Sequence, residues 1–367
     1  MKALGFFLTT PVYILILEVD VKTFTRVMTM KITIKDIAKE AGVSIATVSR
    51  VINEKDRVDP ETRAKVQKAI KKSGFQPDLV ARTMVMKESR TIGLLVPTLA
   101  NEYWALLSEA IQEELWAAGY TLMLCTTGNM YESKGAAYIQ ALLRRKMDGI
   151  IIGAFHIPLA ERDLEVLLKN KIPMVAFDQR IPGVHMVSGD HFHGAMEVVQ
   201  HLVNLGHKRI AYIHGAGSSD ERELGYRCVL ESNGIGVDGR LIKKTRFGID
   251  QGHQAVIELI ESGEQFTSVF CWNDLIAFGA IKALQAKGFH VPEDVAVVGY
   301  DDIITAAVFT PSLTTMAQPI REIGSAIVKL LMESIHNQRK DSFPQSITFQ
   351  MKLKVRESCG AGLMKHL

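Results

Sequence analysis

The sequence contains little cysteine. Its four cysteines are spread along the chain without forming a Cys-x-x-Cys pair: Cys125, Cys228, Cys271 and Cys359. They therefore predict neither a disulfide framework nor a zinc site, and they fit a reducing compartment, which we expect to be the cytoplasm.

Long apolar runs are also missing, and the first 30 residues match an export signal only in part. Phe6–Leu17 is mostly apolar, but Pro11 interrupts it, and Glu18 and Asp20 stand where a small-residue cleavage site is expected. The run is also shorter than the ~20 residues that span a bilayer. We therefore expect no membrane segment, and we read residues 1–30 as an extension that is disordered or not native to the protein.

Motifs of common catalytic sites are absent as well. The sequence has no P-loop and no nucleophile elbow, so it favours neither a nucleotide-hydrolysing enzyme nor an α/β-hydrolase. His191 and His193 are separated by one residue, but no third metal ligand stands at a recognisable spacing. We expect no metal, no cofactor and no enzymatic activity.

Charge is distributed unevenly. Residues 31–90 hold 14 Lys and Arg against 8 Asp and Glu, whereas residues 91–367 hold 26 against 30. A small basic segment joined to a mildly acidic body indicates that the basic segment binds a polyanion.

The basic segment has the pattern of three short helices. Thr33, Ser44 and Asp59 are predicted helix N-caps, and glycines end the first and third helices. Two helices joined by a tight glycine-containing turn, with a third in support, is the helix-turn-helix plan, although any small three-helix bundle has the same periodicity.

The residues themselves are more specific than the pattern. The segment from Ile34 to Asn53, with Ala41-Gly42-Val43-Ser44-Ile45-Ala46-Thr47-Val48-Ser49-Arg50 at its centre, resembles the lactose-repressor (LacI/GalR) family, and so does Val58–Arg63. The resemblance implies a DNA-binding domain over residues 31–76 that binds an approximately palindromic operator as a homodimer.

In that family three exposed positions of the second helix select the operator, and they correspond here to Ile45, Ala46 and Arg50. Arginine suits a bidentate contact with guanine, and the two apolar side chains suit a thymine methyl group. The remaining predicted DNA contacts of this domain are with the phosphate backbone: Ser44, Thr47, Ser49 and Asn53.

Residues 77–90 resemble the hinge helix and linker of the family. The resemblance implies that a hinge containing Ala81 becomes ordered on DNA and inserts Met84 into the minor groove, where leucine is usual. Asp78 replaces the usual asparagine. The alternative is a solvated linker.

From residue 91 the pattern changes to alternating strands and helices. Short apolar strands are predicted near residues 92–97, 120–125, 149–152, 173–178, 209–214, 241–247, 268–271 and 295–300, with amphipathic helices between them. This alternation predicts an α/β fold of parallel, doubly wound sheets, and its length favours two lobes. We expect this domain to span residues 91–358 and to mediate dimerisation, with a tail over 359–367.

Ligands of such folds bind beyond the carboxyl ends of the strands, and polar or aromatic residues gather there. The candidates are Tyr103, Trp104, Asp178, Arg222, Asn273 and Asp301. Acids, an amide, an arginine and aromatic faces suit the hydroxyl groups and C–H surface of a sugar. Alternatively, Asp178 and Asp301 cap helices, and Tyr103 and Trp104 belong to the core.

These residues lie on motifs that resemble the sensor domain of the same family, which has the type I periplasmic-binding-protein fold. The motifs are Asn101–Trp104, Arg222–Tyr226, Trp272–Asp274 and Gly299–Asp302. The resemblance adds Phe247 as a residue that stacks on the ligand. His191 departs from the family pattern, in which asparagine often follows the aspartate that corresponds to Asp190.

The sequence therefore predicts a transcription regulator, which we expect to be a repressor, whose operator affinity responds to a sugar or sugar derivative bound between two lobes. An exported sugar-binding protein of a transporter would share residues 91–358 but would have no helix-turn-helix. A glycosidase with Asp178 and Asp301 as paired carboxylates is the second alternative. The effector, the operator sequence and the direction of the response are not encoded in any motif.

Overall fold

Residues 32–52, 58–75, 88–128, 135–153, 161–215, 221–337 and 343–362 are described by a computed structural model. The chain divides into one unit up to Lys87 and a second from Glu88. The backbone N–H groups of Ser89 and Arg90 donate to the Asp148 carboxylate at 2.7 and 2.8 Å. The last residues of the predicted linker therefore belong to the second unit.

The first unit is a bundle of three helices, α2 (Ile34–Ala41), α3 (Ile45–Ile52) and α4 (Pro60–Ser73). The predicted caps are present. The Asp36 carboxylate accepts from the N–H and hydroxyl of Thr33, and the Asp59 carboxylate accepts from the N–H of Thr62. The small core consists of two buried residues from each helix: Ile37, Ala38, Val48, Val51, Val66 and Ala69.

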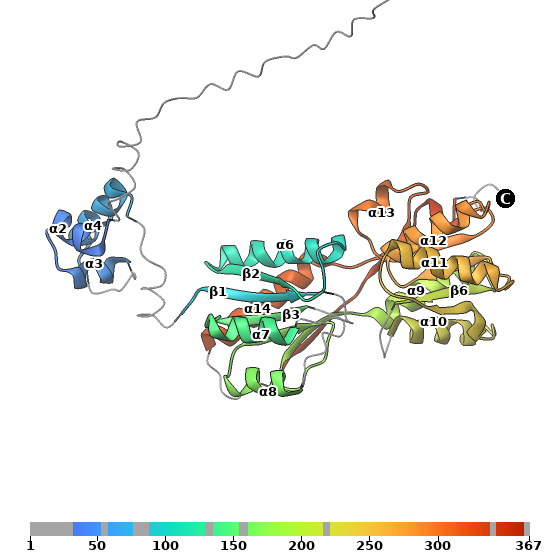
Figure 1. The fold of residues 1–367 in the computed structure, drawn as a ribbon, viewed down its shortest axis with the longest axis horizontal. Helices are drawn as coiled ribbons and strands as arrows, with labels where there is room; N and C mark the ends of the chain where they lie inside the picture. The colour runs from blue at the N-terminus through green and yellow to red at the C-terminus, as the bar shows by residue number, and fades with distance from the viewer. Residues whose placement is uncertain are drawn as a thin grey trace, which may run out of the picture. The chain divides into compact units, whose positions relative to one another are not determined.

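The second unit has two lobes, each built on a six-stranded sheet (Figure 1). The first lobe has the strand order β11-β5-β4-β3-β1-β2, and all its neighbouring strands are parallel. Its strands are β1 (Thr91–Val96), β2 (Thr121–Thr126), β3 (Gly149–Gly153), β4 (Met174–Phe177), β5 (His185–Gly189) and β11 (Ser346–Phe349).

Helices cover both faces of this sheet. On one face α6 (Glu102–Ala117) packs against α14 (Ile320–Asn337). On the other, α7 (Gly135–Arg144) and α8 (Glu161–Lys169) lie over a separate apolar cluster that includes Ile139 and Leu167. Both faces of the central strands are therefore buried, which explains their continuous apolar runs.

The second lobe has the order β12-β10-β9-β8-β6-β7, in which only the pairing of β12 with β10 is antiparallel. Its strands are β6 (Ile210–His214), β7 (Ile242–Lys244), β8 (Ser268–Cys271), β9 (Ala296–Asp301), β10 (Thr314–Ala317) and β12 (Lys352–Lys354). Its helices are α9 (His191–Asn204), α10 (Glu221–Ser232), α11 (Ile249–Glu261), α12 (Asp274–Ala286) and α13 (Ile304–Val308), with single 3₁₀ turns at Gly239–Leu241 and Glu357–Cys359.

The chain passes between the lobes three times, from β5 to α9, from β10 to α14 and from β11 to β12 (Figure 1). Each lobe is therefore assembled from separate stretches of sequence. These connections also place the ends of β5, β10 and β11 at the junction between the lobes.

The predicted fold class and the two lobes are confirmed, but the sequence missed four strands, β5, β10, β11 and β12. These strands are short, and three of them alternate between exposed and half-buried residues or contain few apolar ones. In β10, the buried positions include two threonines, Thr314 and Thr315. Apolar periodicity is therefore weakest in the segments next to the connections. Cys359, predicted to begin the tail, is buried, so the folded unit extends at least to this residue.

Candidate functional site

The strand ends at the junction bring together side chains from both lobes. Asp178 follows β4 of the first lobe, while Asp301 ends β9 and Gln318 follows β10 of the second. Two further residues reach the junction from helix starts, His191 as the first residue of α9 and Arg222 in the first turn of α10. This is the edge at which open α/β sheets bind ligands.

Arg222 lies at the centre of this group and is buried, with its side chain 2% exposed. Its guanidinium carbon lies 4.1 Å from the centre of the Trp272 ring and 3.9 Å from that of Tyr300. One terminal nitrogen donates to the Trp272 carbonyl, and the other lies 3.9 Å from a carboxylate oxygen of Asp301. Two aromatic faces and an acid therefore hold the cation in a fixed plane.

Asp301 connects Arg222 to the first lobe. Its Oδ1 accepts a hydrogen bond of 2.8 Å from Gln318 Nε2, and Gln318 Oε1 accepts one of 3.0 Å from the Tyr103 hydroxyl. Burial raises the pKa of Asp301 to about 6, against the opposing effects of Arg222, the Gln318 hydrogen bond and His191. The carboxyl group therefore titrates close to neutral pH, a property that clusters at functional sites.

Asp178 and His191 form the other half of the group. Asp178 Oδ1 lies 3.1 Å from His191 Nε2 and accepts a hydrogen bond of 3.2 Å from the Gly189 N–H. His191 Nδ1 in turn lies 3.3 Å from the second terminal nitrogen of Arg222. A chain of polar contacts thus runs from the first lobe through Arg222 and back to the first lobe at Tyr103.

Two acceptors of the first lobe are buried without a donor. Within the described part of the chain, no group hydrogen-bonds to Asp178 Oδ2 or to Gln179 Oε1. A buried acceptor without a donor costs roughly 1–3 kcal/mol. Such an atom in a native structure calls for a functional explanation.

Backbone strain coincides with both acids. Asp178 has a φ of 52° and Asp301 a φ of 115°, in a region that residues other than glycine rarely occupy. Neither acid caps a helix, since β5 follows Asp178 and the N-cap of α13 is Ile303. The capping alternative is therefore wrong for both, and strain of this kind is concentrated at functional sites.

The other predicted effector residues lie around this group. Phe247 is 37% exposed and packs against Trp272, with ring centres 4.8 Å apart and the rings tilted by 47°. Trp104 and Tyr103 are both buried in the core, as the alternative held, although the Tyr103 hydroxyl also reaches Gln318. The Asn273 side chain accepts from the Ile276 N–H and so caps α12.

Asp274, beside Asn273, has a structural role. It is buried and accepts from the Thr315 hydroxyl at 2.5 Å and from the Ile303 N–H at 2.9 Å. Burial raises its pKa well above the usual range of a carboxyl group, with Asp301 contributing in the same direction. These contacts tie the start of α12 to β10 and to the segment before α13.

A second connection between the lobes lies beside the group. The Glu102 carboxylate at the start of α6 accepts from the backbone N–H of Thr305 at 3.1 Å and from its hydroxyl. Thr305 belongs to α13 of the second lobe, so the two lobes are joined outside the Arg222 contacts as well.

Four participants were not among the predicted site residues. His191 had been noted only as a departure from the family pattern, and Trp272 and Tyr300 only as parts of motifs. Gln318 was missed because β10 was not predicted, although a polar residue directly after a strand is the signal that identified Asp178. The glutamine could have been found by the same rule.

The helix-turn-helix presents the predicted reading face to solvent. Ile45, Ala46 and Arg50 are exposed on α3, opposite the buried Val48 and Val51. The Ser44 hydroxyl accepts from the Thr47 N–H at 3.1 Å and contacts the Thr47 hydroxyl at 2.9 Å, so Ser44 caps α3 as predicted. Ser49 is half-buried. The predicted DNA contacts Asn53, Ala81 and Met84, and the hinge, lie outside the described residues.

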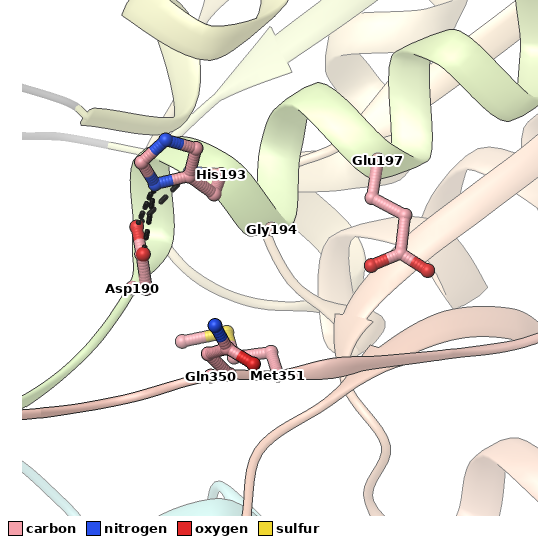
Figure 2. A pocket seen from close by; sticks show the side chains of 6 residues that line it. All are labelled: Asp190, His193, Gly194, Glu197, Gln350 and Met351. Carbon is pink, nitrogen blue, oxygen red and sulfur yellow. Dashed lines mark hydrogen bonds and ion pairs between the residues drawn. The ribbon is translucent and has the colours of Figure 1, made fainter.

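A cavity of about 330 Å³ lies at the start of α9, beside the connection from β11 to β12 (Figure 2). It is lined by Asp190, His193, Gly194, Glu197, Gln350 and Met351. In Figure 2 the His193 ring is turned toward Asp190, whose carboxylate it contacts at 2.8 and 2.9 Å. His191 and His193 thus have different partners, and no cluster of metal-ligating side chains occurs in the part of the chain that is described.

Comparisons with known proteins agree with this arrangement. Residues 33–78 match the bacterial regulatory proteins of the lacI family, and residues 199–359 match a periplasmic binding protein-like domain. The transcriptional regulator DegA of Bacillus subtilis is 34% identical, over 90% of this chain and 98% of its own length. The ribose operon repressor of Halalkalibacterium halodurans is also 34% identical, with the same coverage.

Among solved structures, the lac repressor dimer bound to operator and the anti-inducer ONPF matches with a TM-score of 0.78 and 26% identity, covering 90% of this chain and 99% of that one. No helix among those described is long and apolar enough to cross a membrane. The presence of a helix-turn-helix head favours a transcription regulator over a binding protein of a transporter. The relatives of the whole chain, which are transcription regulators, favour the same conclusion. The chain belongs to the lacI family of bacterial regulatory proteins.

Proposed function

We propose that this protein is a cytoplasmic repressor that binds a palindromic operator as a homodimer. Its affinity for the operator rises or falls when a neutral sugar binds between its lobes. The relatives are transcriptional regulators, one of them a ribose operon repressor. In keeping with this, we propose that the site binds its ligand without transforming it.

The buried contacts that join the lobes around Arg222, between His191 and Asp178 and between Gln318 and Tyr103, carry the proposal. The side chains of Asp178, His191, Arg222 and Asp301 are each at most 5% exposed. Because these side chains belong to both lobes, a ligand that contacts them is coupled to the arrangement of the lobes. That coupling is what a ligand needs in order to shift a conformational equilibrium.

The chemistry of the group favours a neutral, hydroxyl-rich ligand. Asp178 Oδ2 and Gln179 Oε1 are buried acceptors, so the ligand should supply donors, as sugar hydroxyls do. A phosphate or carboxylate would instead face the two acids Asp178 and Asp301. The Trp272 and Phe247 rings, 4.8 Å apart, offer apolar surface for the C–H face of a sugar ring.

DNA binding rests on the exposed face of α3. Operator selection from a pool of random duplexes tests it directly. We expect two inverted half-sites, because two recognition helices related by a twofold axis read the same sequence in opposite directions. Enrichment of a single unpaired half-site, or no enrichment, would contradict a dimeric repressor.

The ligand proposal requires a separate screen. The thermal midpoint of the protein should be recorded with neutral sugars, sugar acids, sugar phosphates and purines at matched concentrations. We expect a rise only with neutral sugars, and the same sugar recovered unchanged afterwards. A sugar phosphate or purine as the sole stabilising compound would contradict the proposed ligand class.

Oligomeric state is the third test. We expect a stable dimer by sedimentation at micromolar concentration. Two recognition helices related by one twofold axis are what a palindromic operator requires, and a dimer supplies them. A stable tetramer would contradict this expectation.

A further inference from the structure

His191 connects the two lobes within the proposed effector site. It is the first residue of α9, directly after the connection from β5, and its side chain is 5% exposed. Its two ring nitrogens lie near groups from different lobes, Nε2 near Asp178 of the first lobe and Nδ1 near Arg222 of the second. The imidazole therefore spans the junction.

The partners determine where the ring carries its proton. A guanidinium can only donate hydrogen bonds, so Nδ1, 3.3 Å from the Arg222 nitrogen, must be the bare acceptor nitrogen. A neutral ring whose Nδ1 accepts carries its hydrogen on Nε2, which lies 3.1 Å from Asp178 Oδ1. This neutral form is the one that can accept from Arg222.

Protonation of Nδ1 would disrupt this arrangement. It would place an N–H against the N–H of Arg222 and bring a second positive charge next to the guanidinium, at a buried position. The acids Asp178 and Asp301 would attract the charged ring, Asp301 lying beside the same Arg222 nitrogen, and the Tyr300 ring lies 5.8 Å away. Loss of the Arg222 contact would leave Asp178 and Arg222 without the residue that joins them.

We propose that His191 is a positioning residue of the effector site, whose neutral ring, protonated at Nε2, holds Asp178 of one lobe and Arg222 of the other in the geometry that receives the ligand. This inference rests on the proposed function.

The tautomer can be measured without any ligand. The whole protein would be labelled with ¹⁵N-histidine, and the ring signals of His191 would be assigned among the 11 histidines by their loss in His191→Gln. We expect a neutral ring with its hydrogen on Nε2 at pH 7.5. A ring protonated at Nδ1, alone or together with Nε2, would overturn the proposal.

Ligand binding tests the positioning role, with D-ribose as the probe in calorimetry. An asparagine at 191 reaches about as far as Nδ1 and retains only the contact to Arg222, whereas a glutamine reaches about as far as Nε2. We expect His191→Asn and His191→Gln each to weaken ribose binding at least tenfold. Unchanged affinity in both variants would overturn the positioning role. No ribose binding by the unsubstituted protein would count against the ribose-like ligand, and the tautomer measurement would still decide whether the ring has the proposed form.

Discussion

The contact between Arg222 and Asp301 leads to a prediction about stability that can be tested without DNA or ligand. Arg222→Met retains an aliphatic chain between the Trp272 and Tyr300 rings but removes the charge. Removing one member of a buried ion pair typically costs 3–5 kcal/mol, because the other charge stays buried without its partner. Here the loss is limited, because Asp301 already has a pKa of about 6 and becomes protonated when its cation is removed. We therefore expect destabilisation near the lower bound, about 3 kcal/mol.

Asp301→Asn should cost less. It leaves Arg222 with the Trp272 carbonyl, His191 and two aromatic faces. It also removes a carboxylate whose ionised form is unfavourable in this environment. In the double variant neither charge is left without its partner, so the two losses should not add. We expect a coupling free energy of about 1–3 kcal/mol, as is found for residues in contact.

Urea unfolding at pH 7.5, followed by tryptophan fluorescence, is the appropriate assay. All three tryptophans, Trp104, Trp116 and Trp272, lie in the second unit, so the signal does not report on the helix-turn-helix head. Additivity of the two substitutions within ~0.3 kcal/mol would refute the interaction on which the site is built.

Three further predictions concern pH, DNA reading and the N-terminus. The pKa of Asp301 is raised from 3.8 to about 6 in the folded protein, so its contribution to stability is fully present below pH 3.8 and is lost as pH rises through 6. The contribution of Asp301 to the free energy of unfolding amounts to roughly 3 kcal/mol. Asp301→Asn should remove that part of the pH dependence, which thermal unfolding at several pH values would measure. An identical profile in the variant would contradict the raised pKa. Arg50→Ala should lose about 1–3 kcal/mol of binding free energy at one operator position and relax the base preference there. Fluorescence anisotropy on single-base operator variants would measure this loss. Full discrimination by the variant would exclude Arg50 from base reading. Deleting residues 1–29 should leave operator affinity unchanged in the same assay, because the Thr33–Asp36 contacts start α2 without them, and weaker binding by the shortened chain would show that the extension contributes.

Much of the architecture could be predicted because its signals are local. Caps such as Asp59, followed by a proline, fix helix starts within a few residues of sequence. Central strands such as β3 are buried on both faces and read as continuous apolar runs. The resemblance of the head rests on an ordered set of residues along α2 and α3, so it was visible without any tertiary information.

The parts that could not be predicted depend on contacts between distant residues. Gln318 joins Asp301 to Tyr103, residues that are about 200 positions apart in the chain. His191 was recognised as unusual, but its two partners become visible only when the connection from β5 to α9 places it between the lobes. Asn273 is a different case. Its side chain makes a local capping contact at the start of α12. The sequence analysis did not anticipate this contact, because the motif around Asn273 resembles a ligand site.

The most direct test of the account is to measure operator affinity with and without the sugar that the thermal screen identifies, in the unsubstituted protein and in Arg222→Met. The account predicts at least a tenfold change in operator affinity on adding the sugar, and the same factor in sugar affinity on adding operator, because the coupling between two sites is reciprocal. Arg222→Met should bind the operator but show neither change. A sugar that binds the protein without altering operator affinity, or an equal response in Arg222→Met, would contradict it.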